Sequence, residues 1–180
     1  MLKYFLHRAI ARLERAFHYD ATYLHEITDI SAGASVKFAL FQIMSSHRDK
    51  VPLDAYCAAR MAATLSEDCG PCTQLVVDAA LKSGMQPARI TALLRGDLEK
   101  AGADAELGFR YGIAVAQNTA DALALSQEAE RRFGKRALVS LAYAVACSRV
   151  YPALKRGLGH GAACTKIAVS DETIVLKHAA

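Results

Sequence analysis

The chain contains no tryptophan, few prolines and few aromatic residues. Its 180 residues include four prolines, and aromatic side chains make up only 7% of the total, whereas hydrophobic residues make up 53%. A hydrophobic content this high argues against a disordered chain. Alanine and leucine dominate in place of aromatic residues, and they favour close-packed helices over a β-sandwich or barrel.

The chain also lacks a concentrated basic segment and a long apolar run. The net charge is +4, and lysine and arginine are scattered outside the first fifteen residues. A nucleic-acid-binding protein normally shows a basic stripe, so we exclude nucleic acid as a partner. No stretch approaches the length that spans a bilayer, and His7, Arg8 and Arg12 interrupt any apolar core of a secretory signal.

The number of cysteines is odd, and they are not spaced densely along the chain as in a disulfide framework. The five cysteines are Cys57, Cys69, Cys72, Cys147 and Cys164. This usage favours a reducing compartment, in which a Cys-x-x-Cys pair is catalytic or binds a metal. We therefore expect a cytoplasmic protein.

Helical periodicity extends along most of the chain. It predicts helices over 2–17, 31–47, 52–65, 69–84, 87–94, 101–118, 120–133 and 135–156. The last of these is apolar almost all round and is expected to be buried. Glycines at 157–161 end it, and residues 173–176 are expected to form a short extended tail. No alternation is strong enough to predict a sheet, so we expect an all-α fold with a single domain over residues 1–180.

The first predicted helix is amphipathic and basic. Its apolar residues recur at helical spacing, with Lys3, Arg8, Arg12 and Arg15 on the opposite face. Docking on the body of the protein or on a neighbouring subunit is the favoured interpretation. Contact with an anionic membrane surface and an organelle-targeting role are the alternatives.

The segment Cys69-Gly70-Pro71-Cys72 is the strongest functional signal in the chain. Two cysteines at i and i+3 share one helical face and lie close enough to form a disulfide. The positive end of the helix that they open stabilises a thiolate. This arrangement predicts a redox-active dithiol, whereas two inert buried thiols are the structural alternative.

Two other interpretations of the pair are weaker. Thioredoxins use the same tetrapeptide, but their dithiol follows a buried strand, and the segment before Cys69 has helical spacing. A structural zinc site needs four ligands, and no second pair with suitable spacing is present. His25 and Glu26 begin like a zinc-protease helix, but Asp29 stands where the second histidine belongs.

The order of motifs resembles the AhpD-like/carboxymuconolactone decarboxylase superfamily. After the Cys-x-x-Cys helix come Gly84-Met85-Gln86-Pro87, Ile90–Asp97, Leu107–Gly112, Phe133–Val139 and Ser148–Leu154 with Gly157. The resemblance covers about residues 50–160. Residues 1–49 form additional N-terminal helices, and 161–180 form a tail.

This resemblance implies an AhpD-like helical bundle that assembles as a homo-oligomer, either a trimer or a hexamer. It also implies thiol-disulfide oxidoreductase activity, with alkylhydroperoxidase as the narrower hypothesis. Cys72 would attack a hydroperoxide or disulfide substrate, and Cys69 would close the disulfide. A partner protein or small thiol would supply electrons, with no organic cofactor and no metal.

The chain departs from the family pattern at two positions. Peroxidase members place a glutamate twelve residues before the first cysteine and a histidine four residues after the second, where this chain has Cys57 and Val76. Neither replaces the proton relay, and the sequence does not show whether His47 or Arg60 approaches the pair. Cys57 is either a third redox thiol or a buried apolar-like residue. The alternative function is therefore a non-catalytic binding or structural protein that has lost the relay.

Overall fold

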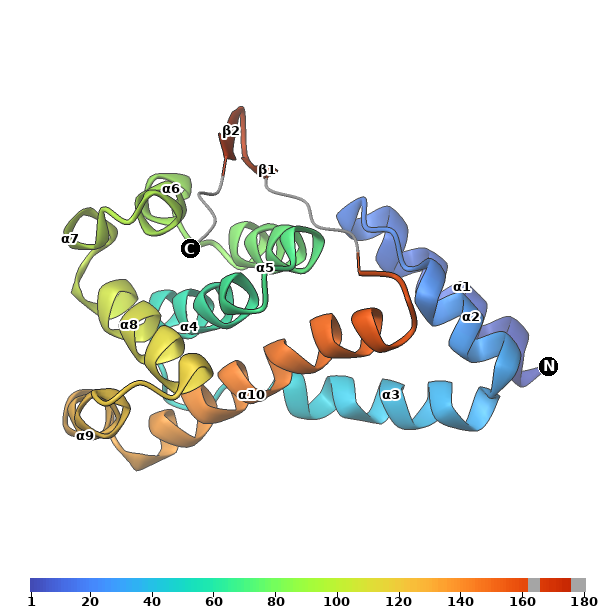
Figure 1. The fold of residues 1–180 in the computed structure, drawn as a ribbon, viewed down its shortest axis with the longest axis horizontal. Coiled ribbons are helices and arrows are strands. Elements are labelled where there is room, and N and C mark those ends of the chain that lie inside the picture. Colours follow the sequence, from blue (N-terminus) through green and yellow to red (C-terminus); the bar gives the residue numbers. More distant parts are fainter. Residues whose placement is uncertain (162–165, 176–180) are drawn as a thin grey trace.

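The chain folds into an all-α structure with one small hairpin (Figure 1). The computed structural model describes residues 1–161 and 166–175. The helices of this part are α1 (Leu2–Phe17), α2 (Thr22–Ile30), α3 (Ala32–Ser45), α4 (Leu53–Ser66), α5 (Gly70–Lys82), α6 (Pro87–Arg95), α7 (Leu98–Ala101), α8 (Ala103–Gln117), α9 (Ala122–Phe133) and α10 (Lys135–Gly157). The strands are β1 (Lys166–Val169) and β2 (Glu172–Val175). The predicted fold class is confirmed.

Local signals place most helix ends where the sequence predicts them. Ser31 caps α3, since its hydroxyl accepts a hydrogen bond from the Ala34 N–H at 3.2 Å. Pro87 opens α6, and Gly96 ends it in the left-handed conformation. The single helix expected over 101–118 is divided, because Gly102 has φ +90° and separates α7 from α8. Helix α2 has no counterpart among the predicted helices.

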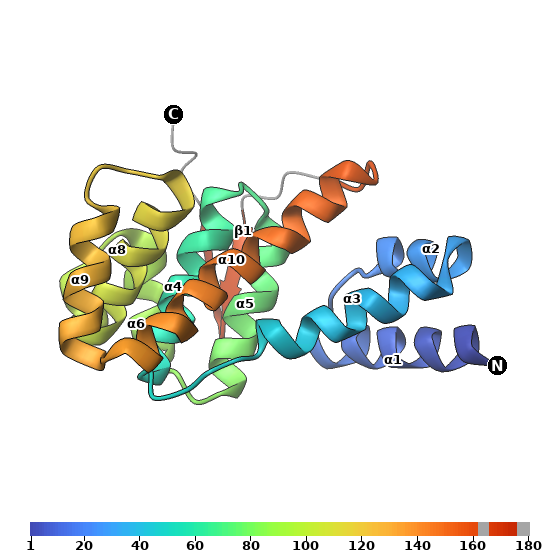
Figure 2. The ribbon, with the colours of Figure 1, turned by 90° about the horizontal axis from the view of Figure 1, so that it is seen from below.

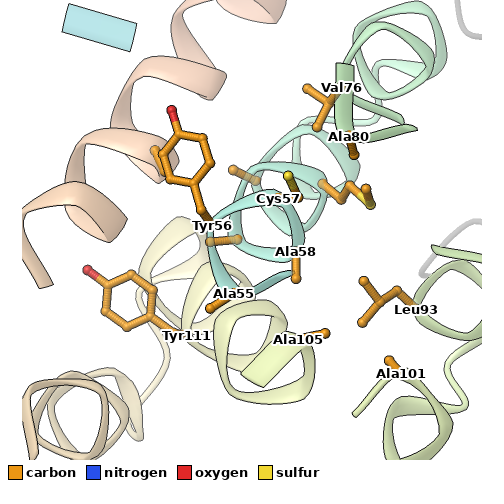
Figure 3. Packing of buried hydrophobic residues seen from close by; sticks show 14 of the residues in the cluster. Ala55, Tyr56, Cys57, Ala58, Val76, Ala80, Leu93, Ala101, Ala105 and Tyr111 are labelled. Carbon is orange, nitrogen blue, oxygen red and sulfur yellow. The ribbon is translucent and has the colours of Figure 1, made fainter. Parts of the chain in front are cut away.

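Helix α4 lies at the centre of the main core, among α5, α8 and α10 (Figure 3). Two glycines of α8 allow the closest contact. A methyl group at Gly108 would overlap the Ala55 carbonyl, and one at Gly112 would lie 2.7 Å from the Ala59 oxygen. The alanines of α4 therefore pack directly against the backbone of α8, which fixes the position of the helix that leads into Cys69.

The first three helices lie at one end of the molecule, beside the C-terminal half of α10 (Figures 1 and 2). Ile10, Tyr19, Tyr23 and Leu24 form a second buried cluster there. Helix α1 contacts α2, α3 and α5, and the Lys82 ammonium at the end of α5 lies 3.8 Å from the Phe17 ring centroid. The C-terminal half of α1 thus docks on the body of the protein.

The prediction that no sheet forms is wrong for residues 166–175. Strands β1 and β2 pair antiparallel, with Ile167 opposite Ile174. The hairpin attaches to α5 through Gln74, whose amide donates to the Ala168 carbonyl at 2.9 Å and accepts from the Ala168 N–H at 2.7 Å. The tail expected over residues 173–176 is therefore extended as far as Val175, and it pairs with strand β1. The pairing is favoured because both strands place apolar residues against the core. Leu176, the last residue of the expected tail, lies outside the described residues.

Helix α10 differs in two respects from its predicted character. Contrary to the prediction that no stretch approaches the length of a membrane span, it is long and apolar enough to cross a membrane by length and composition alone, although 44% of its most apolar window is buried within the protein. A core helix passes the same test, so this is weak evidence for a membrane span. The helix is also less buried than expected, because Val139, Tyr143 and Val150 are exposed.

Candidate functional site

The two cysteines that the sequence singles out are joined in a disulfide at the start of α5. Their Cα atoms lie 5.3 Å apart. Cys69 occupies the N-cap position, and Cys72 lies in the first turn of the helix. Asp68 precedes them with φ +51°, which turns the chain from the end of α4 into α5. The predicted dithiol is therefore formed by a tight connection between two core helices.

The N-terminus of α5 begins at the disulfide itself. The Cys69 side chain at the N-cap makes no capping hydrogen bond to the helix. Pro71 has no N–H, while the Cys69 carbonyl accepts the Thr73 N–H at 2.9 Å. The first N–H groups of a helix seek an acceptor, and together they place a partial positive charge at its start. A thiolate formed on Cys69 or Cys72 after reduction would lie in that field.

Cys69 faces a cavity lined by both acidic and basic side chains. The cysteine is partly exposed and lines a cavity of about 270 Å³ together with Glu67, Asp68, Lys155, Arg156 and His160. Lys155 is only 7% exposed, and burial lowers the pKa of its ammonium. Its Nζ lies 5.2 Å and 5.4 Å from the ring centroids of Tyr19 and Tyr23. Acidic and basic groups thus gather together beside the more exposed of the two sulfurs.

Cys72 faces a different cavity. It is 3% exposed and lines a largely apolar space of about 170 Å³ between the N-terminal helices and the main core. We call this space the Cys72 cavity; its apolar walls include Leu13 and Phe17 of α1 and Leu75 and Ala79 of α5. One disulfide therefore joins a partly exposed sulfur beside charged side chains to a buried sulfur beside a largely apolar cavity.

The connection before Cys69 is held by an ionic cluster. The Glu67 carboxylate accepts hydrogen bonds from Arg149 at 2.6 Å and Arg156 at 2.5 Å, and Arg156 also donates to the Glu67 carbonyl at 2.8 Å. Burial opposes ionisation of Glu67, but the hydrogen bonds from Arg156 and Arg149 outweigh it and lower the pKa of the carboxyl. From the sequence alone, Glu67 is expected to raise the pKa of the neighbouring thiols. In the structure its charge is compensated by two guanidinium groups.

Arg60 lies on the wall of the Cys72 cavity, whereas His47 does not. The Arg60 guanidinium carbon is 5.6 Å from the Tyr56 ring centroid, and within residues 1–161 and 166–175 it forms no ion pair with a carboxylate. His47 is exposed beyond the end of α3, where its ring packs edge-on against Tyr143. Of the two groups that the sequence left open, only Arg60 shares a cavity with the dithiol.

The positions that hold the family glutamate and histidine are buried in the main core. Figure 3 shows Cys57 on α4, with Val76 and Ala80 of α5 on the same side of the cluster. Burial raises the pKa of the Cys57 thiol to about 11, and Cys57 is a free thiol, as is the buried Cys147. Neither position supplies a proton relay. Cys164 lies outside the described residues.

The described residues contain no group of three histidine, cysteine or acidic side chains arranged to hold a metal ion. The His25 ring stacks on His7, and their Nδ1 atoms are 2.6 Å apart. The outer nitrogen of His7 lies 3.0 Å from Asp29, and that of His25 lies 3.4 Å from Glu14. This polar chain ties α1 to α2.

Sequence reasoning missed several groups that surround the dithiol. Lys155 lies in a helix that the sequence marks as buried, and a lysine in such a helix is a usable signal. Ser148, which lines the Cys72 cavity, was missed as well, whereas Tyr19 and Tyr23 of the same cavity are tyrosines that the sequence offers either as pocket-lining residues or as core-edge packing. Their positions depend on how α2 and α10 pack against α5, which residue spacing along the chain does not specify.

Comparisons with protein-family models, with curated proteins and with solved structures find no match to this chain. The similarity to the AhpD-like superfamily therefore stays a prediction from the order of sequence motifs. The fold and site define a coarser class, an all-helical protein with a disulfide at the start of a core helix.

Proposed function

We propose that the protein is a thiol-disulfide oxidoreductase that uses Cys69 and Cys72, with alkylhydroperoxidase activity as its specific form. The observation that carries this proposal is the asymmetry of the disulfide. Cys72 is buried and lines a largely apolar cavity, and Cys69 is partly exposed and lines a separate cavity with acidic and basic side chains. A redox dithiol must meet two reactants in turn, an oxidant and a reductant, and two separate approaches suit that task.

In the oxidising half of the cycle, the Cys72 thiolate attacks the terminal oxygen of an organic hydroperoxide. The O–O bond breaks, the alcohol leaves after taking up a proton, and Cys72 becomes a sulfenic acid. The Cys69 thiol then attacks the Cys72 sulfur, water leaves, and the disulfide forms. Two thiols and one hydroperoxide thus give one disulfide, one alcohol and one water.

In the reducing half, a thiolate of a partner protein or a small thiol attacks Cys69. Cys69 is the more accessible sulfur, so the mixed disulfide forms there and the Cys72 thiolate leaves. A second thiol of the reductant resolves the mixed disulfide and carries away the oxidised product. No organic cofactor or metal takes part in these steps.

Three groups take the place of the absent glutamate and histidine. The N-terminus of α5 favours negative charge on either sulfur. Arg60 adds a cation to the cavity of Cys72, and Lys155 adds one to the cavity of Cys69. Because burial lowers the pKa of Lys155, its ammonium is also a better proton donor than an exposed lysine.

The test is a pulse of cumene hydroperoxide on the fully reduced protein, followed by alkylation and peptide mass mapping. Rapid formation of the Cys69–Cys72 disulfide is expected in the wild type and in the control variant Cys57→Ser. Cys72→Ser should abolish peroxide consumption, and Cys69→Ser should stop at a sulfenic acid. Unchanged turnover in either active-site variant would contradict the proposal.

The competing function is a non-catalytic binding or structural protein. The burial of Cys57 and Val76 in the core favours it, because the usual relay is absent. Under this alternative the reduced cysteines should titrate near the ordinary thiol pKa of about 8.5. A thiolate populated well below neutral pH would exclude it.

We also propose that the protein is a cytoplasmic homo-oligomer. Leu40, Ile43 and Met44 of α3 are exposed, as are Val139 and Tyr143 of α10. His47 packs on Tyr143, so the end of α3 and the middle of α10 form one surface, which we call the α3–α10 face. An apolar surface shared by two adjacent helices is typical of a subunit contact. A trimer or hexamer is the expected assembly.

A further inference from the structure

The Cys72 cavity contains polar groups that the dithiol chemistry does not require. Ser148 is 2% exposed, and its hydroxyl has no hydrogen-bond partner among the described residues. The same holds for the hydroxyl of Tyr19, which is 6% exposed. Tyr23 lies close enough to affect the pKa of Tyr19 but outside hydrogen-bonding geometry. Buried hydroxyls are normally paired, so two unpaired ones on a single cavity indicate a missing partner.

The missing partner is an acceptor with negative charge. Arg60 lines the same cavity and, among the described residues, has no carboxylate to neutralise it. Burial raises the pKa of the Tyr19 phenol, so this hydroxyl keeps its proton at neutral pH and can donate it. A guanidinium and two hydroxyl donors fit a carboxylate, which accepts through two oxygens and carries one negative charge.

The remainder of the cavity limits the size of the bound molecule. Its other walls are apolar and include Leu13, Phe17 and Leu75. The volume of about 170 Å³ is close to that of an apolar cavity of about 150 Å³ that holds benzene. One aromatic ring, or an aliphatic chain of similar size, fills such a space.

We propose that the Cys72 cavity binds a small organic monocarboxylate, with its carboxylate on Arg60, Ser148 and Tyr19 and its apolar body between α1 and α5. This site stands on its own as a binding site. One extension rests on the proposed function: the hydroperoxide that oxidises Cys72 carries such a carboxylate, which anchors it while its O–O bond meets the sulfur.

The first experiment titrates sodium benzoate into the disulfide form of the protein by calorimetry. We expect a dissociation constant of roughly 1 mM or tighter, the range open to a ligand of this size. Benzamide has the same shape without the charge and should bind at least tenfold more weakly. Equal binding of benzamide, or no heat with benzoate, would overturn the proposal without any variant.

Two variants then assign the binding to Arg60. Arg60→Gln should weaken benzoate binding at least tenfold, and Arg60→Lys should restore part of it. Arg110→Gln is the matched control, because Arg110 lies on α8 and pairs with Glu106 at 3.8 Å. Thermal unfolding checks that each variant is folded. Unchanged affinity in a folded Arg60→Gln variant would overturn the assignment.

A second readout separates the binding site from the redox chemistry. Benzoate should bind to Cys72→Ser as it does to the wild type. A carboxylate-bearing aryl hydroperoxide should oxidise the wild-type dithiol at least tenfold faster than cumene hydroperoxide, and Arg60→Gln should remove that preference. Benzoate binding without any oxidation would defeat the proposed function alone, whereas oxidation without benzoate binding would defeat this inference alone.

Discussion

Cys69 and Cys72 share one disulfide but line two different cavities. The backbone geometry at the start of α5 is responsible, because Cys69 is the N-cap and Cys72 lies within the first helical turn. The two sulfur atoms belong to the same kind of side chain, but their surroundings differ. Reagents that approach from solvent should distinguish them.

The first prediction concerns this difference in access. In Cys72→Ser, the remaining Cys69 thiol should react with a bulky aromatic disulfide reagent at least tenfold faster than Cys72 does in Cys69→Ser. Cys69 is the partly exposed sulfur, and Cys72 is 3% exposed. Stopped-flow absorbance measures both rates. Equal rates would show that the two cavities do not control access.

The second prediction concerns Glu67 and pH. Glu67→Gln should lower the free energy of unfolding at pH 7 by about 1 kcal/mol, because the carboxylate loses charge-assisted hydrogen bonds to two partly exposed arginines. The pKa of Glu67 is lowered in the folded protein. Its contribution is therefore present above the unfolded pKa of about 4.3 and is lost as pH falls through the folded pKa.

Urea denaturation at pH 7 and pH 3 measures this effect, and the two stabilities should differ less in Glu67→Gln than in the wild type. Glu99→Gln on α7 is the control and should stay within about 0.5 kcal/mol of the wild type. An unchanged pH dependence in Glu67→Gln would show that the two arginines do not stabilise the ionised carboxylate.

The third prediction concerns Cys57. Burial raises the pKa of its thiol to about 11, so it should resist iodoacetamide at pH 7.5 while reduced Cys69 is labelled. A raised folded pKa also means that its contribution to stability is complete below about pH 8.5 and is lost as pH rises toward 11. Stability should therefore fall less steeply over that range in Cys57→Ala. Rapid labelling of Cys57 in the native protein would revive the three-thiol mechanism.

The fourth prediction concerns the contact between α4 and α8. Gly108→Ala should destabilise the protein by about 3 kcal/mol or more, because the added methyl group meets the Ala55 carbonyl rather than a movable side chain. Gly157→Ala is the matched control, since a methyl group there meets nothing within 4 Å. Urea denaturation compares the two variants. A neutral Gly108→Ala would mean that α4 can move away from α8.

The fifth prediction concerns assembly through the α3–α10 face. Ile43 is 69% exposed on this face. Ile43→Asp should reduce the mass measured by light scattering to that of a monomer, because an aspartate cannot be buried in an apolar contact without a partner. Leu123→Asp on α9 is the control, since Leu123 is equally exposed but lies elsewhere. A monomeric wild type would contradict the proposed oligomer.

The sequence was sufficient for the features that depend on neighbouring residues. Pro87 and Gly96 mark the ends of α6, and the spacing of Cys69 and Cys72 predicts their disulfide. Features that depend on packing were not accessible. The spacing along 101–118 is helical, yet Gly102 breaks it, and α10 is apolar all round but covers the core with only part of its surface. The two cavities arise where α1, α2 and α10 meet α5, so they have no signature in any single segment.

The attachment of the hairpin has a consequence for how the site is completed during synthesis. Gln74 lies one turn from Cys69 on α5, and both of its amide atoms bind the backbone of Ala168, ninety-four positions later. While the ribosome still holds that later segment, α5 lacks its two hydrogen bonds to Ala168, although every residue that lines the two cavities precedes the hairpin in the chain. The linings of both cavities are therefore synthesised before the hairpin, which is the last described element to attach to α5.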